Sequence, residues 1–173
     1  MMFTLMENLI HIRSMEQSDL LKIAQIEKKN FPDPWPLQSF RECLRFGYYC
    51  LVLEENSTLQ AYAIMSIESD SAHILNLCVC PEVRRCGLGR RILNYLLKLA
   101  EVAQVDSISL EVRASNCPAI NLYKTAGFVQ VDIRKHYYPN ETGSENALVL
   151  MRELSIGMTN NNRGAVIIEQ NDK

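Results

Sequence analysis

Residues 76–91 read Asn76-Leu77-Cys78-Val79-Cys80-Pro81-Glu82-Val83-Arg84-Arg85-Cys86-Gly87-Leu88-Gly89-Arg90-Arg91, and this segment says most about the architecture of the chain. An apolar strand passes through a turn rich in glycine and arginine, and an amphipathic helix begins directly after it. The first N–H groups of a helix lack backbone partners and lie at the positive end of the helix dipole, so they favour an anion. Gly87 and Gly89 carry no side chains that would keep a bulky phosphate from the backbone. The segment therefore predicts a site for a pyrophosphate group.

Two common phosphate-binding motifs do not fit this turn. The Walker pattern needs a Lys-Ser or Lys-Thr pair after its second glycine, and none is present. The dinucleotide fingerprint needs a third glycine, whereas Gly89 is followed by Arg90, Arg91 and Ile92. What remains is Arg84-x-x-Gly87-x-Gly89, with four arginines between residues 84 and 91. The alternative interpretation is a solvated turn at the start of a surface helix.

Length and composition indicate one globular domain. The chain has 173 residues, 47% of them hydrophobic, which is enough for a sizeable core. The net charge of −2 argues against a general nucleic-acid surface, so the arginines of the turn are a local feature. The six cysteines form no Cys-x-x-Cys pair, and the three histidines are dispersed. We therefore expect free thiols in a reducing compartment and no metal site.

Composition at the two ends of the chain bears on its localisation and on the bounds of the domain. The first ten residues include Glu7 and lack a basic leader followed by an apolar core, and no apolar run approaches a membrane span. We therefore expect a cytoplasmic protein with no membrane partner. After Leu154 the composition becomes polar, which predicts a domain over residues 1–154 and a disordered tail over residues 155–173.

Apolar periodicity predicts the order β-α-α-β-β-β-α-β-α-β-β. We expect strands at residues 10–14, 48–54, 59–67, 73–80, 107–113, 128–133 and 147–154. We expect helices from Asp19 (as its cap) to about residue 29, from 37 to about 46, from about 88 to 103, and from residues 115–118 to Gly127. Residues 136–146 are expected to be a loop. The predicted fold is a mixed α/β domain, with a mostly antiparallel sheet of about seven strands, about four helices and one parallel crossover beside the phosphate turn.

This order and several motifs resemble the GNAT acetyltransferases over roughly residues 10–154, and Arg84-x-x-Gly87-x-Gly89 matches their acetyl-CoA signature. The second half resembles more specifically the bacterial ribosomal-protein-alanine N-acetyltransferases. The matching motifs are Phe31-x-x-Pro34-Trp35, Leu110-Glu111-Val112-Arg113-Ala114-Ser115-Asn116, Ala119-Ile120-x-Leu122-Tyr123, Gly127-Phe128 and Arg134-Lys135-x-Tyr137-Tyr138-Pro139. One departure is Glu145-Asn146-Ala147, where that family usually has Glu-Asp-Ala. The lost carboxylate affects the expected peptide preference and leaves the expected chemistry unchanged.

The resemblance implies acetyl-CoA as the co-substrate. It places the pantetheine arm against the backbone of Leu77, Cys78 and Val79, where a backbone N–H also polarises the thioester carbonyl. The residues expected to hold the pyrophosphate are Arg84, Arg85, Cys86, Gly87, Leu88, Gly89 and Arg90. Asn116 is expected to contact the cofactor arm. A helix cap is its alternative role, and the two roles are compatible.

The same resemblance implies two catalytic residues. Glu111 is the expected general base, because an α-amino group has a pKa near 8 and a carboxylate acting through a water can deprotonate it at neutral pH. Its alternative role is an ion pair with Arg113 or another cation. Tyr123 is the expected general acid, which protonates the departing thiolate. Its alternative role is a core tyrosine with its hydroxyl at the rim.

Four aromatic residues are expected to line the acceptor slot: Phe31, Trp35, Tyr137 and Tyr138. For Phe31 and Trp35 the alternative is an aromatic plug that closes the core. The resulting hypothesis is an acetyl-CoA-dependent enzyme that acetylates the N-terminal alanine of a ribosomal protein and contacts no nucleic acid directly. The alternatives are a GNAT acting on a small amine or a lysine side chain, and a non-catalytic CoA-binding regulatory module.

Overall fold

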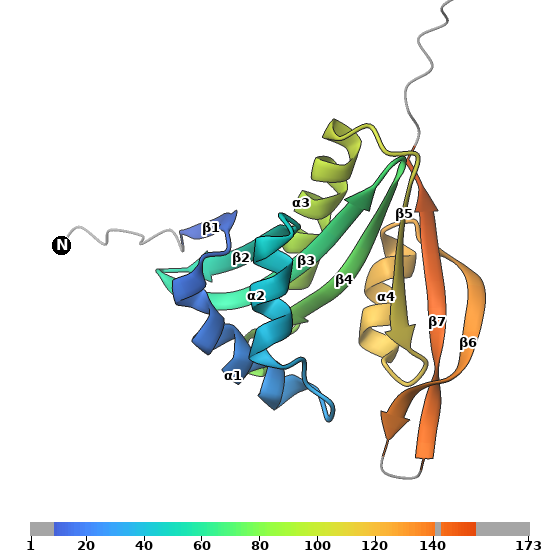
Figure 1. The fold of residues 1–173 in the computed structure, drawn as a ribbon, viewed down its shortest axis with the longest axis horizontal. Helices are drawn as coiled ribbons and strands as arrows, with labels where there is room; N and C mark the ends of the chain where they lie inside the picture. The colour runs from blue at the N-terminus through green and yellow to red at the C-terminus, as the bar shows by residue number, and fades with distance from the viewer. Residues whose placement is uncertain (1–8, 141–142, 155–173) are drawn as a thin grey trace, which may run out of the picture.

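The computed structural model describes residues 9–140 and 143–154. Its helices and strands are β1 (Ile10–Ser14), η1 (Gln17–Asp19), α1 (Leu20–Asn30), α2 (Leu37–Arg45), β2 (Tyr49–Glu55), β3 (Thr58–Glu68), β4 (Ser71–Val79), η2 (Pro81–Val83), α3 (Leu88–Val102), β5 (Ser107–Arg113), α4 (Cys117–Thr125), β6 (Val129–Asn140) and β7 (Gly143–Glu153). The strands form one sheet in the order β1-β2-β3-β4-β5-β7-β6 (Figure 1). Within the described residues, this confirms the predicted fold and order. The predicted tail over residues 155–173 lies outside them.

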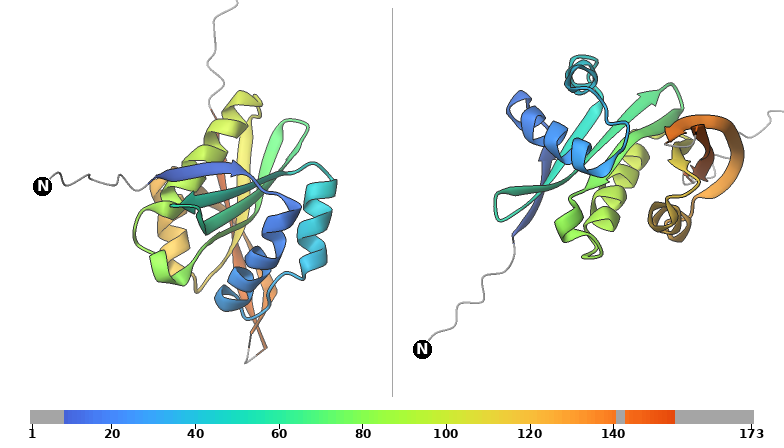
Figure 2. Two further views of the ribbon diagram at one scale, coloured as in Figure 1. Left: turned by 90° about the vertical axis from the view of Figure 1, so that its left-hand side faces the viewer. Right: turned by 90° about the horizontal axis from the view of Figure 1, so that it is seen from below.

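Helices cover both faces of the first half of the sheet. Figure 2 shows α1 and α2 on one side of the sheet and α3 on the other. On β2, Leu51 and Leu53 pack into the core beneath α3, whereas Cys50 and Val52 pack beneath α1 and α2. A strand buried on both faces reads as a continuous apolar run, as residues 50–53 do. Within the described residues, no helix is both long and apolar enough to cross a membrane.

The parallel pairing of β4 with β5 is short. Residues 71–74 of β4 pair with residues 107–110 of β5, and every other strand pair in the sheet is antiparallel. Beyond these residues the two strands diverge, as Figure 1 shows. The register of β3 against β4 shifts between Ile64 and Met65, which leaves Leu75 as an extra residue on β4 at the point of divergence. The sheet is therefore open between the last residues of β4 and those of β5.

The predicted loop over residues 136–146 was wrong for residues 136–140 and 143–146, which belong to β6 and β7. Residues 141–142 lie outside the described part of the chain. Arg134 pairs with Ala147 and Tyr138 with Glu145, so residues 135–137 oppose Asn146 alone. The Asn146 Oδ1 accepts a hydrogen bond from the His136 backbone N–H at 3.1 Å. The His136 backbone has φ 53°. A composition rich in polar residues indicated a loop, and only cross-strand pairing shows the bulged hairpin.

The predicted helix ends have mixed outcomes. Asn116 is confirmed as a cap, since its Oδ1 accepts from the Ala119 N–H at 3.3 Å, and Gly127 has the expected left-handed backbone with φ 88°. Asp19 does not cap α1. Its carboxylate instead accepts from the Glu16 N–H at 2.8 Å and from Arg13 at 2.8 and 2.9 Å. The Arg13 guanidinium lowers the pKa of Asp19.

Glu27 is a buried carboxylate that joins four segments of the chain. Its side chain lies in α1 and the residue is 1% exposed. It accepts hydrogen bonds from the Trp35 backbone N–H at 3.0 Å, from the Tyr62 hydroxyl and from Asn76 Nδ2 at 3.4 Å. A buried carboxylate is stable when several donors satisfy it. Glu27 thus ties the loop after α1 to β3 and to the diverging part of β4.

We expect Glu27→Ala to lower the free energy of unfolding by about 2–3 kcal/mol, because buried donors of Trp35 and Tyr62 lose their acceptor. Urea denaturation of the variant and the parent chain measures the difference. Lys28→Ala, at an exposed position of the same helix, is the matched control and should change stability by less than about 0.5 kcal/mol. Equal stability of Glu27→Ala and the parent would show that this carboxylate does not support the fold.

Candidate active site

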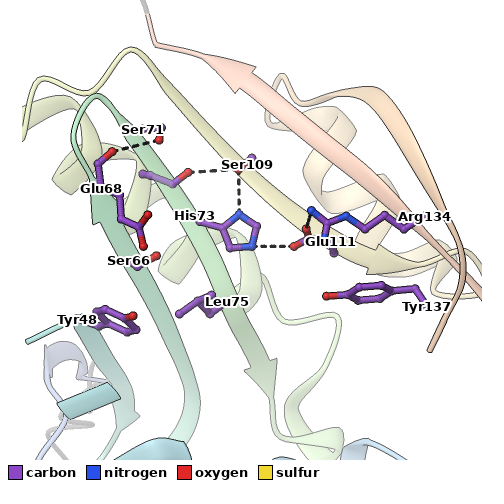
Figure 3. A pocket seen from close by; sticks show the side chains of 11 residues that line it. Tyr48, Ser66, Glu68, Ser71, His73, Leu75, Ser109, Glu111, Arg134 and Tyr137 are labelled. Carbon is purple, nitrogen blue, oxygen red and sulfur yellow. Dashed lines mark hydrogen bonds and ion pairs between the residues drawn. The ribbon is translucent and has the colours of Figure 1, made fainter. Parts of the chain in front are cut away.

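A polar pocket of about 420 Å³ lies beside the point where β4 and β5 begin to separate. It is on the sheet face that carries Ser109 and Glu111, because Ile108 and Leu110 point into the core beneath α3 on the other face. Figure 3 shows the lining side chains, which come from β3 to β6 and from the residue before β2. The lining residues are Tyr48, Ser66, Glu68, Ser71, Ala72, His73, Leu75, Ser109, Glu111, Arg134 and Tyr137.

Glu111 is held at both of its carboxylate oxygens. Its Oε2 lies 2.7 Å from His73 Nε2, and its Oε1 lies 2.9 Å from an Arg134 Nη2 atom (Figure 3). The side chain is 10% exposed. Arg113, the cation named as its alternative partner, pairs instead with Glu145 at 2.8 Å and lowers the pKa of that carboxyl. Glu111 is therefore a shielded carboxylate on the wall of an open polar pocket, where an amine can reach it.

His73 is a site residue that the sequence did not identify. The parallel register sets it opposite Ser109, and its Nδ1 lies 2.9 Å from the Ser109 Oγ. Alternation along β4 shows that residues 71, 73 and 75 share a face, but the register across a helical crossover cannot be read from one sequence. His73 is therefore absent from the predicted site residues. Arg134 belongs to a matched motif but was not predicted to be a site residue, and it also lines the pocket.

Tyr123 is buried in α4, with 6% of the residue exposed, and packs edge-on against Phe128 at 5.7 Å between ring centroids. Within the described residues its hydroxyl makes no hydrogen bond. Burial raises the pKa of this phenol, and the Tyr138 and Cys78 side chains raise it further. The hydroxyl therefore stays protonated at neutral pH.

Gly87 and Gly89 are each favoured at their positions in the turn for a different structural reason. Gly87 precedes α3 with φ 82°, a left-handed conformation that L side chains rarely adopt. A Cβ on Gly89 would lie 3.4 Å from Leu122 Cδ2 and 3.5 Å from Val79 Cγ2, so the first turn of α3 packs closely against α4 and β4. Neither residue has a side chain that could cap the free N–H groups of α3. The helix start is left accessible to an anion.

The arginines of the turn are oriented by neighbouring helices. Arg84 donates to the Asn30 Oδ1 at the end of α1, and Arg90 donates to the Thr125 Oγ1 at the end of α4. Arg85 is exposed and has φ 67°, and the Cys86 side chain is exposed beside it. The turn therefore combines fixed positive charges with free helix N–H groups. This is the arrangement that a pyrophosphate requires.

The end of β4 offers backbone groups to the opening in the sheet. Leu77, Cys78 and Val79 pair with Ala63, Tyr62 and Ala61 of β3 on one edge, and the described residues contain no strand paired with them on the other edge. The Cys78 side chain is 4% exposed in the core beneath α1 and α2, and burial raises the pKa of its thiol to about 12. At this position the backbone is therefore available to a ligand, and the thiol is inert.

The four aromatic residues expected around the acceptor divide into two groups. Tyr137 lines the pocket, whereas Tyr138 stacks on the Arg113 guanidinium at 4.4 Å and contacts Tyr137 edge-on. Phe31 and Trp35 are partly buried and pack against the core beneath α1 and α2. Neither lines the pocket that contains Glu111. The bulge in β6 explains the first group, because it turns both Arg134 and Tyr137 toward the same pocket although they are three residues apart.

Known proteins that are similar to this chain are acetyltransferases. The model of the acetyltransferase (GNAT) family matches residues 20–128. The chain is 36% identical over 145 residues to the ribosomal protein bS18-alanine N-acetyltransferase of Escherichia coli (strain K12), a match that covers 84% of this chain and 98% of that protein. The chain belongs to the GNAT family of acetyltransferases. Enzymes of this family use acetyl-CoA as the acetyl donor.

A second relative and a solved structure extend the comparison. A putative ribosomal protein bS18-alanine N-acetyltransferase of Bacillus subtilis (strain 168) is 36% identical over 141 residues, which are 80% of this acetyltransferase and 92% of that protein. The crystal structure of the ribosomal-protein-S18-alanine N-acetyltransferase from Escherichia coli superposes with a TM-score of 0.82 and 35% identity, over 88% of this chain and 98% of that one. The similarity therefore spans most of the chain.

The arginine–glycine turn can be tested through Cys86, whose side chain is exposed on it. We expect acetyl-CoA to slow alkylation of Cys86 several-fold, because the bound pyrophosphate covers the turn. A Cys117→Ser background leaves Cys86 as the one exposed cysteine, since the other four are buried. Mass spectrometry of the labelled peptide gives the rate. Pantetheine, which lacks the pyrophosphate, is the control ligand and should not protect, and equal rates with and without acetyl-CoA would place the cofactor elsewhere.

Proposed function

We propose that this acetyltransferase transfers an acetyl group from acetyl-CoA to the N-terminal α-amino group of a protein, and that the favoured acceptor is the N-terminal alanine of a ribosomal protein. The position of Glu111 carries the proposal. Its shielded carboxylate lies on the wall of an open polar pocket, beside the point where β4 and β5 begin to separate. The relatives in Escherichia coli and Bacillus subtilis, which bear this activity in their names, support the choice of acceptor. The proposal implies a cytoplasmic enzyme.

The described residues offer partners for two parts of acetyl-CoA, its pyrophosphate and its pantetheine arm. The turn at residues 84–90 would hold the pyrophosphate, and the unpaired edge of residues 77–79 would pair with the amides of the pantetheine arm. Asn116, which caps α4 shortly after the end of β5, would contact the cofactor arm. Bound acetyl-CoA supplies an acetyl group that is already activated as a thioester.

Glu111 and Tyr123 would move the two protons of the reaction. Glu111 would remove a proton from the acceptor amine, directly or through a water in the pocket. Tyr123 would donate its phenolic proton to the departing thiolate. Its hydroxyl is protonated and has no hydrogen-bond partner among the described residues. A backbone N–H within residues 77–79 would stabilise the charge that develops on the carbonyl oxygen.

The strength of the base favours an N-terminus over a lysine. An α-amino group has a pKa near 8, whereas a lysine side chain has a pKa near 10.4, so far less energy is needed to deprotonate the first. Glu111 accepts from His73 and from Arg134, one on each carboxylate oxygen, so its carboxylate is held in place beside the pocket. Tyr137 would form one wall of the slot for the first acceptor residues. A non-catalytic module that only binds CoA would require neither the shielded Glu111 carboxylate nor the buried Tyr123 phenol.

Glu111→Gln and Tyr123→Phe test the proposed roles. Each should lower kcat by about 10²-fold or more, because each removes one proton transfer, while the dissociation constant of acetyl-CoA changes by less than about twofold. Calorimetry measures the binding and a coupled thiol assay measures turnover. Glu101→Gln, on the exposed surface of α3, is the control and should keep the parent rate. Near-normal turnover in both site variants would contradict the assignment.

A panel of acceptors tests the substrate class. The enzyme is incubated with acetyl-CoA and either a bS18 N-terminal peptide that begins with alanine, the same peptide with a blocked α-amine and an internal lysine, or small free amines. We expect acetylation of the unblocked peptide at its α-amine, located by fragmentation mass spectrometry. Faster transfer to the lysine or to the small amines would identify the alternative acceptors, and cofactor binding without any transfer would identify a regulatory module.

A further inference from the structure

We infer that His73 is a positioning residue for Glu111, and that Ser109, His73 and Glu111 form one hydrogen-bonded chain that aims the base at the acceptor amine. The inference rests on the proposed role of Glu111. His73 Nε2 lies 2.7 Å from Glu111 Oε2, and His73 Nδ1 lies 2.9 Å from the Ser109 Oγ (Figure 3). His73 acts through Glu111 and is not itself assigned a contact with substrate.

The chain is rigid because of where it lies in the sheet. His73 and Ser109 are direct partners in the four-residue parallel pairing between β4 and β5. Glu111 is two residues beyond Ser109 on the same face of β5. It lies just past Leu110, the last residue of β5 that pairs with β4. The hydrogen bond from His73 therefore spans the first step of the opening between the strands. It ties the base, on the separating strand, to the part of the sheet that stays closed.

The contact with the Glu111 carboxylate requires a proton on Nε2 of the imidazole, because an ionised carboxylate only accepts. In the neutral ring Nδ1 then accepts from the Ser109 hydroxyl, whereas in the protonated ring Nδ1–H donates to Ser109 Oγ and this hydroxyl donates to the Ala72 carbonyl oxygen at 3.5 Å. The protonated ring also donates from Nε2, so the contact with Glu111 survives in both charge states. A carboxylate offers about four lone-pair sites. His73 and Arg134 use one on each oxygen, which leaves room for the amine or for a bridging water.

Arg134 alone does not orient the base to the same degree. It reaches Glu111 from the edge strand β6 with a long side chain that is 49% exposed and also lies over the Tyr137 ring. His73 has a short, stiff side chain, 31% exposed, on a strand paired on both sides at this position. The titratable or charged groups that face His73 across the pocket are Tyr48, Glu68, Glu111, Arg134 and Tyr137. Within this group, His73 fixes the direction of the Glu111 carboxylate.

The test compares His73→Leu with His73→Gln. Leucine has a similar volume and no donor, whereas the glutamine amide can still donate to Glu111. We expect His73→Leu to lower kcat by about 10- to 100-fold, because a displaced base loses alignment with the amine, with acetyl-CoA affinity unchanged. His73→Gln should stay within a few-fold of the parent.

A double-mutant cycle separates this inference from the proposed function. If His73 acts through Glu111, adding His73→Leu to Glu111→Gln should cause no further loss of turnover. An additional loss of 10-fold or more in that background would show an independent role and overturn the inference. So would a parent-like rate of His73→Leu while Glu111→Gln is strongly impaired. A parent-like rate of Glu111→Gln would overturn both this inference and the proposed base.

Ser109→Ala gives a second route to the same conclusion without a change in the ring. It removes the partner of Nδ1, so we expect a several-fold loss of kcat and no change in the melting temperature beyond that of Ser107→Ala, a matched control at a half-buried serine of the same strand. The comparison also covers the case in which His73→Leu does not fold. A parent-like kcat of Ser109→Ala, together with equal losses in His73→Gln and His73→Leu, would assign His73 a packing role only.

Discussion

The structure depends on the early separation of two parallel strands. β4 and β5 share only residues 71–74 and 107–110, and the backbone of residues 77–79 then has no strand on its outer edge. Free backbone groups are costly unless water or an extended ligand satisfies them. The opening therefore explains why this face of the sheet suits a chain-like cofactor. The phosphate turn, which follows β4 directly, and α4, which follows β5, lie at its two sides.

Two sets of polar contacts and one packing contact hold the opening between β4 and β5 in shape. On the side of β4, the buried Glu27 carboxylate binds Asn76 and the Tyr62 hydroxyl, so the diverging segment stays attached to α1 and β3. On the side of β5, the hydrogen bond between His73 and Glu111 crosses the gap at its narrow end. Close packing of Gly89 against Leu122 brings α3 and α4 together beneath. A small number of polar contacts thus positions a site that the hydrophobic core alone would leave loosely defined.

Local patterns accounted for much of the fold. The strong alternation of Ile108, Leu110 and Val112 and the helical spacing of Ile92 and Leu96 mark elements whose burial agrees with the structure. The loop over residues 136–146 failed because β6 is exposed along most of its length, so no buried face produces an apolar alternation there. The cap at Asp19 failed because Arg13, six residues earlier, competes for the carboxylate. Errors of this kind arise where a distant partner outweighs a local preference.

By itself, the sequence determined the order of the elements, the arginine–glycine turn at the start of α3 and the residue types suited to acetyl transfer at Glu111 and Tyr123. These follow from periodicity, from backbone conformations that favour glycine, and from matched motifs, all of which are local in the chain. Only the tertiary structure decided that His73 and Arg134 hold Glu111, that Tyr137 lines its pocket, and that Phe31 and Trp35 pack against the core. Those contacts depend on a parallel register set across a helical crossover and on a bulge in an edge strand. Neither leaves a periodic trace in the sequence.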